Sequence, residues 1–119
     1  MHLHIEKIGE MTIIECAGRV VSSDTAFRLR DAVTTQRDAR IIVVDLSEVR
    51  SIEGGGLGML AFLRRWAHDH DIQFKLFNPT KSVCDRLESL STLLDCDIAT
   101  LGEMMDLLAN ADTRYTLAA

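Results

Sequence analysis

The 119-residue sequence has one proline, three cysteines and no long apolar run. Because no apolar stretch approaches the roughly 18 residues that cross a bilayer, we expect no direct membrane insertion. The first residues, MHLHIEKIGEM, are charged and alternate polar with apolar positions, unlike a signal peptide. Basic clusters are missing too, and 18 acidic against 13 basic residues give a net charge of −5. Since a positive surface supplies most affinity for nucleic acids, we expect no nucleic-acid binding.

The few cysteines form no recognisable pattern. Cys16, Cys84 and Cys96 are odd in number and far apart, and no C-x-x-C pair occurs. Such residues are typical of buried thiols in a reducing compartment. We therefore expect a cytoplasmic protein that meets a membrane, if at all, through a partner.

Strand and helix patterns alternate along the chain. Alternating or continuous apolar residues predict strands at residues 2–6, 11–17, 41–46 and 72–78. Apolar residues at helical spacing predict helices beginning near residues 22, 55, 79 and 100, the second of them ending near 69. Residues 111–119 have no pattern and are expected to form a loose tail. This order predicts one α/β domain over residues 1–110, with an N-terminal hairpin, a mixed, mostly parallel sheet of four or five strands and about four helices.

Capping signals and apolar stripes support three of these helices. The predicted caps are one of Ser22, Ser23 and Asp24, then Asn78 with Pro79 as the first helical residue, and last a Thr100-x-x-Glu103 capping box. The apolar stripes consist of Ala26, Leu29 and Val33, then Val83, Leu87 and Leu90, and finally Leu101, Met104, Met105 and Leu108.

Three glycines, at positions 54 to 56, stand between the 41–46 strand and the following helix. Glycine-rich turns of this kind often bind phosphate groups. Neither known pattern fits, because Met59 and Leu60 occupy positions where a Walker loop needs glycine and lysine, and Met59 also interrupts the dinucleotide fingerprint. Glu53 beside the helix start would repel a phosphate. We expect only incidental anion binding there.

No residue pattern indicates catalysis or metal binding. His68 and His70 are two positions apart at a helix end and point in different directions. His2 and His4 share one face of a strand, but the sequence supplies no third ligand. Asp45 ends a predicted central strand without a partner base or nucleophile, and we expect its carboxylate to accept hydrogen bonds from backbone amides in the turn. We expect a protein that is not an enzyme and uses no cofactor.

The segment VVDLSEVRSIEGGGLGMLAFLRRWA resembles the STAS domain family, the fold of sulfate transporters and anti-sigma-factor antagonists. In that family an apolar strand ends in Asp-Leu, and Asp-Ser-Ser-Gly-Leu-Gly and an apolar helix follow. The matching positions here are Asp45-Leu46, Gly56-Leu57-Gly58, Gly18-Arg19, Leu29-Arg30 and Asn78-Pro79.

The resemblance implies a degenerate phosphorylation site. In bacterial anti-sigma-factor antagonists of this family, an anti-sigma kinase phosphorylates the second serine of the motif, and the domain then releases the kinase. Aligned on Gly56, the first serine becomes Gly54 and the phosphoacceptor becomes Gly55, which has no hydroxyl. Glu53 replaces the family's aspartate. It is a poorer N-cap, although its charge complements the helix dipole.

A helical wheel separates two faces of the helix over residues 56–69. The face expected in the core contains Met59, Leu60, Phe62, Leu63, Trp66 and Ala67. The opposite face, with Gly58 at the helix start, is the predicted partner-binding surface and contains Leu57, Ala61, Arg64 and His68. Leu57 is either a partner contact or a boundary residue under the preceding loop, and Phe27 in the first helix is either exposed or covered.

We expect a regulatory protein-binding module that resembles an anti-sigma-factor antagonist and is not phosphorylated at Gly55. Its partner would be a kinase-type anti-sigma factor or another regulator that binds STAS domains. The alternative is an accessory subunit that docks on the ATPase of a bacterial lipid-type ABC transporter, a role in which phosphorylation is not needed. Binding of a nucleotide or another small ligand has only the glycines in its favour.

Overall fold

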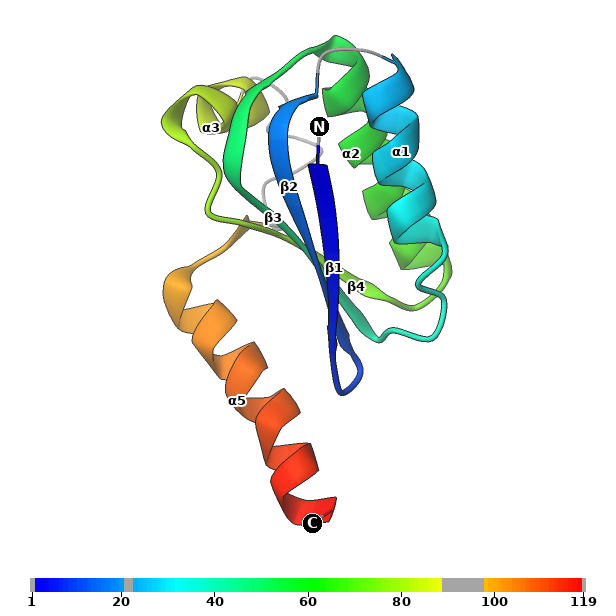
Figure 1. Cartoon of the computed structure of the whole chain (residues 1–119), viewed down its shortest axis with the longest axis vertical. Helices are drawn as coiled ribbons and strands as arrows, with labels where there is room; N and C mark the ends of the chain where they lie inside the picture. The colour runs from blue at the N-terminus through cyan, green and yellow to red at the C-terminus, as the bar shows by residue number, and fades with distance from the viewer. Residues whose placement is uncertain (1, 21–22, 89–97, 119) are drawn as a thin grey trace.

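The computed structural model describes residues 2–20, 23–88 and 98–118 (Figure 1). The strands are β1 (His2–Ile8), β2 (Met11–Val20), β3 (Ile41–Ile52), β4 (Gln73–Phe77) and β5 (Ile98–Ala99). The helices are α1 (Ser23–Thr34), α2 (Gly54–Asp69), α3 (Lys81–Glu88) and α5 (Leu101–Ala118). The predicted single α/β domain with a mixed sheet and four helices is confirmed for the part of the chain that the structure describes.

The five strands form one sheet in the order β1-β2-β3-β4-β5. β1 pairs antiparallel with β2, while β2, β3, β4 and β5 pair in parallel. The predicted N-terminal hairpin is present, since Ile8 pairs with Met11 across a turn at Gly9 and Glu10. Gly9 has a φ of 61°, a left-handed conformation that glycine adopts without a steric penalty.

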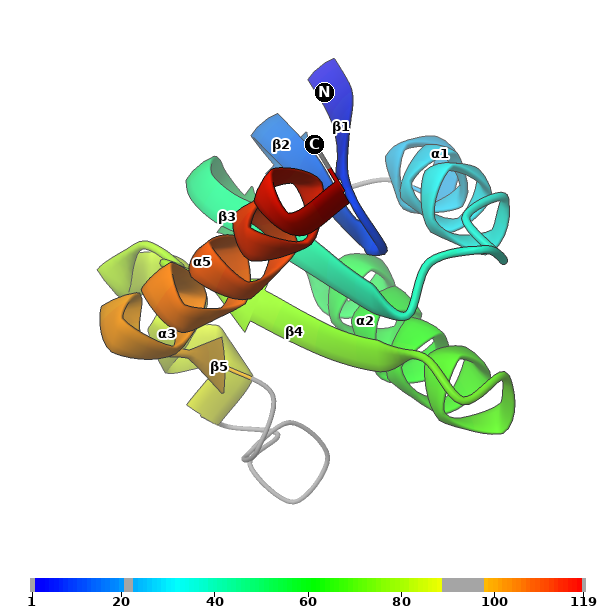
Figure 2. The ribbon, with the colours of Figure 1, turned by 90° about the horizontal axis from the view of Figure 1, so that it is seen from below.

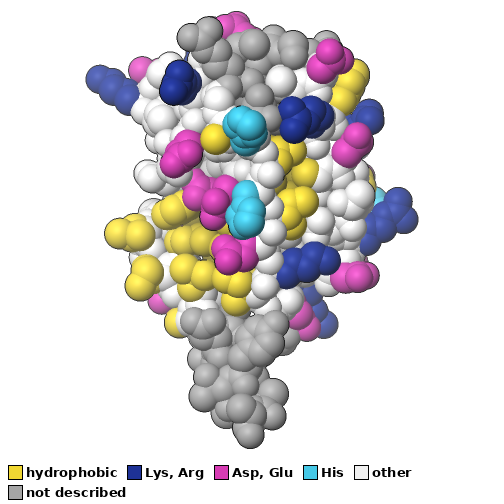
Figure 3. Space-filling model, viewed as in Figure 1, with side chains coloured by type: hydrophobic (Ala, Val, Ile, Leu, Met, Phe, Trp, Pro, Cys, Tyr) yellow, Lys and Arg dark blue, Asp and Glu magenta, His cyan; other side chains and the backbone are white. Residues whose placement is uncertain are grey.

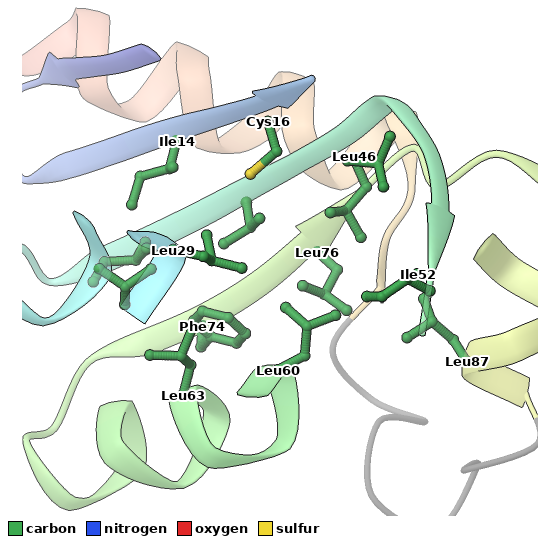
Figure 4. Close-up of a cluster of buried hydrophobic side chains, with 14 of the residues drawn as sticks. Ile14, Cys16, Leu29, Leu46, Ile52, Leu60, Leu63, Phe74, Leu76 and Leu87 are labelled. Carbon is green, nitrogen blue, oxygen red and sulfur yellow. The ribbon is translucent and has the colours of Figure 1, made fainter. Parts of the chain in front are cut away.

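Helices cover the sheet on both faces (Figures 1 and 2), with α1 and α2 on one face and α5 on the other. The larger core lies under α1 and α2 (Figure 4), where Ile14 and Val44 of the sheet pack with Leu29 and Leu60. The smaller core lies under α5, where Met104 packs against Val43 and its neighbours. β3 therefore contributes alternate residues to two cores. The prediction that this strand is central is confirmed.

Several predicted helix details are confirmed. The stripe of Ala26, Leu29 and Val33 is buried. The capping box is formed, because the Glu103 N–H donates to Thr100 Oγ1 at 3.0 Å and the Thr100 N–H donates to Glu103 Oε1 at 3.5 Å.

Other predictions are wrong in detail. α3 begins at Lys81, and Thr80 caps it by accepting the Val83 N–H at 3.3 Å, whereas Asn78 adopts a left-handed φ of 51°. The backbone of α5 continues to Ala118, so the predicted loose tail from residue 111 is helical.

In α5, only Met104 of the predicted stripe is buried, because the helix packs on the sheet along one narrow line. Ser22, Leu90 and Cys96 lie outside the described residues.

Candidate functional site

The glycine segment forms the start of α2. β3 ends at Ile52, Glu53 is the N-cap residue, and the helix begins at Gly54. The first helical hydrogen bond runs from the Leu57 N–H to the Glu53 carbonyl at 2.9 Å. Gly54 and Gly55 are exposed, whereas Gly56 faces the protein interior. Bare backbone is therefore accessible over the first turn of this helix.

Side chains would fit at most of these glycines. A Cβ atom added at Gly54, Gly55 or Gly58 would meet no atom within 4 Å, and none of the three has a left-handed φ. Position 55 can therefore hold a serine without displacing a neighbour. Sterics do not require glycine at these three positions.

Glu53 interacts with α3. Its side chain makes no capping hydrogen bond, as expected of a poor N-cap. Its Oε2 atom lies 3.6 Å from Nη2 of Arg86, and both side chains are about half exposed. This ion pair connects the start of α2 to the last turn of α3. This ion pair could not be predicted from the sequence, because the two residues belong to different helices and lie far apart in the chain.

Two side chains of α2 differ from the prediction in whether they face the core or the solvent. Leu57 is 6% exposed and belongs to the larger core, so the prediction that its side chain contacts a partner is wrong. Phe62 was expected in the core but is 50% exposed. Leu57 is covered because the first turn of α2 packs into the larger core. The core-facing stripe consists of Gly56, Leu57, Leu60, Leu63 and Ala67.

The other predicted partner-binding residues lie together. Ala61, Arg64 and His68 line one hollow of about 460 Å³ with Arg65 and Asp69. Ala61 and Arg64 are half-buried, and His68 is exposed. Arg65 and Asp69 are additions to the predicted set. The hollow combines apolar surface with the charged side chains of Arg64, Arg65 and Asp69.

A second hollow of about 460 Å³ lies where β2 and β3 end, beside the β3–α2 junction. Its lining includes Gly18, Ser47, Arg50 and Thr80. The Ser47 N–H donates to Asp45 Oδ1 at 2.9 Å, so the backbone hydrogen bond expected for Asp45 is present. The prediction that Asp45 ends the strand at a turn is wrong, because β3 continues to Ile52. Ser47 is half-buried by these contacts.

Cys16 lies behind Asp45 in the larger core. Burial raises the pKa of its thiol from 9.0 to about 12, with a further contribution from the nearby Asp45 carboxylate. A thiol with this pKa is protonated at neutral pH and is a weak nucleophile. Cys16 is thus a structural residue.

All four histidines are exposed. Among residues 2–20, 23–88 and 98–118, no three His, Cys, Asp or Glu side chains are placed to hold a metal ion. His70 stacks on the Trp66 ring at 4.6 Å between centroids and its Nδ1 lies 2.8 Å from the Trp66 carbonyl oxygen, so it has a local role at the helix end.

The family assignment rests on the strands and helices between residues 2 and 100, which include the start of α2. The STAS domain family matches residues 2–100. The chain belongs to the STAS domain family. The resemblance seen in the sequence is thereby confirmed at the level of the family. No similarity to a curated protein sequence was found.

Solved structures share the STAS fold at low sequence identity. Phosphorylated SpoIIAA, a Bacillus cell fate determinant, has 17% identity and a TM-score of 0.70 over 90% of this chain and 99% of its own. An anti-sigma factor antagonist from Mycobacterium paratuberculosis has 16% identity and a TM-score of 0.74 over 91% and 93%. Mglu has 20% identity and a TM-score of 0.61 over 67% of this chain, which spans only 20% of the Mglu chain. No helix in the described part of this STAS domain is both long and apolar enough to cross a membrane.

Proposed function

We propose that this STAS domain is a regulatory protein-binding module, without enzymatic activity, that binds its partner through the start of α2 and is not phosphorylated at Gly55. The partner is a kinase-type anti-sigma factor, which places the module in the cytoplasm with its ATP-dependent partner. A phosphate would add about −1.5 to −2 charges to this surface. Without an acceptor hydroxyl, binding is constitutive or is ended by a competing protein.

One observation supports this proposal above the others. Gly55 is exposed at the start of α2, and the space around it would admit a serine side chain. The position is therefore accessible to a protein that docks there and lacks only the reactive group. The hollow lined by Ala61, Arg64 and His68 continues the same helix and enlarges the proposed contact surface.

The experiment compares the natural chain with Gly55→Ser and Gly55→Ala. Each is mixed with a purified kinase-type anti-sigma factor and ATP, and phosphate incorporation and binding are measured by mass spectrometry and calorimetry. We expect the natural chain and Gly55→Ala to bind with and without ATP and to gain no phosphate. Gly55→Ser is expected to gain one phosphate and then to lose binding.

Two outcomes would contradict the proposal. One is phosphorylation of the natural chain at Ser47 or Ser51 with loss of binding. The other is binding that a Gly55→Trp substitution leaves unchanged, because a large side chain in the open space at the start of α2 would then meet no partner.

The absence of a hydroxyl at Gly55 equally suits an accessory subunit that docks permanently on a transporter ATPase. Co-purification from the native cell distinguishes the two functions. Recovery of a membrane permease with its ATPase would favour the transporter, whereas recovery of a soluble kinase-type ATPase would favour the regulatory module.

A further inference from the structure

β1 is the long open edge of the sheet. It pairs with β2 on one side, and no described segment pairs with its other side. β5, at the opposite edge, has two residues, whereas β1 has seven. β1 is the strand nearest the viewer in Figure 1, and the same view of the surface shows backbone beside exposed histidine side chains there (Figure 3). An edge strand of this length presents unpaired N–H and C=O groups to other chains.

The hairpin turn determines which backbone groups of β1 face outward. The two-residue turn has a left-handed φ at its first residue, Gly9, and Ile8 pairs with Met11 across it. Such a turn is closed by hydrogen bonds between the two flanking residues, and bonded pairs alternate with non-bonded pairs along an antiparallel ladder. The even-numbered residues of β1 therefore bond to β2, and the odd-numbered residues direct their N–H and C=O groups away from β2. These outward-facing residues are Leu3, Ile5 and Lys7.

We propose that a second copy of this chain pairs with this edge, with the two β1 strands antiparallel about a two-fold axis at Ile5. In this register Ile5 faces Ile5 of the other copy, and Leu3 of each copy faces Lys7 of the other. All three are outward-facing residues, so each gains main-chain hydrogen bonds from the pairing. A two-fold contact uses the same strand of both copies and forms one continuous sheet through them.

The polar side chains of β1 favour this register over its neighbours. His4 faces Glu6 of the other copy, and both side chains are exposed in the single chain. A shift by one residue would pair outward-facing with inward-facing backbone groups. A shift by two would place Glu6 opposite Glu6 or His4 opposite His4. Because unlike partners across two strands are favourable and like charges are not, the register centred on Ile5 is preferred.

The same register covers an exposed apolar residue. Ile5 is 40% exposed, and its neighbour on β2, Ile14, belongs to the larger core. Two Ile5 side chains that face each other would extend this core across the axis. Lysine on an edge strand opposes pairing, but the two Lys7 residues lie about 14 Å apart along the strands here. A contact limited to one strand per copy buries little area, so we expect a weak dimer.

This inference does not depend on the proposed function, because no residue of α2 contributes to the β1 edge. The experiment measures the mass of the full chain by sedimentation from about 1 µM to about 1 mM, the range of a weak association. We expect the average mass to rise from one copy to two over this range. Ile5→Pro removes an outward-facing N–H without removing a bond to β2, so this variant should remain one copy. Ile5→Val, the matched control, keeps the N–H and should still associate.

An exchange of side chains tests the register. His4→Glu places two carboxylates opposite each other at two places in the dimer, and should raise the midpoint concentration at least about tenfold. The His4→Glu, Glu6→His double variant restores unlike partners and should associate about as the natural chain does. Circular dichroism verifies that each variant remains folded. If the proline variant does not fold, the exchange alone decides.

Three results would overturn the proposal. The first is a natural chain that stays one copy at about 1 mM. The second is association that a folded Ile5→Pro variant leaves unchanged. The third is a double variant that associates no better than His4→Glu, because the strands would then not pair in this register.

Discussion

The glycine residues of this domain fall into two groups that differ in backbone conformation. Gly55 is helical and surrounded by open space, whereas Gly18, beside an irregularity in the β2–β3 pairing, has a φ of 111°. Alanine is better than glycine in a helix by about 0.5–1 kcal/mol. Gly55→Ala should therefore raise the free energy of unfolding by about that amount in urea denaturation.

Gly18→Ala is the control for this prediction. A side chain at a left-handed φ is strained, so this variant should unfold at a lower urea concentration than the natural chain. Equal effects of the two substitutions would mean that backbone conformation does not distinguish the glycines.

The buried thiol of Cys16 should make stability depend on pH. Its pKa is raised in the folded state from 9.0 to about 12, so only the unfolded chain ionises this thiol between those values. The free energy of unfolding should not depend on this thiol below pH 9. As the pH rises from 9 towards 12, it should fall by at most about 1.4 kcal/mol per pH unit. Urea denaturation at pH 8, 9 and 10 should show this decline. The Cys16→Ala variant should show less of it.

The residue types and their spacing were enough to predict some of the roles of single residues. The hydrogen bond that the Asp45 carboxylate accepts from a nearby backbone N–H followed from its sequence neighbours. The ion pair of Glu53 with Arg86 did not, because the distance between α2 and α3 depends on how both pack on β3.

At the scale of elements, the capping box at Thr100 offers a direct test. The Thr100 hydroxyl accepts the Glu103 N–H at 3.0 Å, and no alanine side chain can replace it. Thr100→Ala should destabilise α5 by about 1 kcal/mol and speed amide exchange in its first turn. Ser82→Ala, an exposed change in α3, should leave exchange in α5 unchanged.

Helix starts show where sequence reasoning succeeds and where it fails. The Thr100 box was predictable because both partners lie within four residues. The start of α3 was predicted two residues early. Thr80 is the N-cap in place of Asn78, because Asn78 adopts a left-handed backbone conformation at the end of β4. Phe62 shows a similar limit: a helical wheel gives the apolar side of α2 but not how widely the sheet covers it.

At the scale of the whole molecule, stability depends on the larger core. Leu60 is fully buried there, so Leu60→Ala should lower the free energy of unfolding by about 2–5 kcal/mol. Phe62→Ala, two residues away and half exposed, should cost less than about 1 kcal/mol. Urea denaturation of both variants measures the difference. Similar losses would indicate that Phe62 is covered in solution.

The overall architecture was largely readable from the sequence. Alternating strand and helix patterns gave the hairpin, the parallel pairing and the central position of β3, because each follows from local periodicity and short connections. Two features were missed. β5 is a two-residue strand with no periodicity, and the helical second half of α5 has no clear apolar pattern of its own.

β3 supplies side chains to both cores, and this has a thermodynamic consequence for any protein that associates with the domain. Two ligands that bind on opposite faces of the sheet contact different atoms of the domain. The close packing around β3 resists displacement of the strand towards either face. Their association free energies should therefore add, to within about 0.5 kcal/mol. A measured coupling larger than that would reveal that β3 itself has two arrangements, each preferred by one of the ligands.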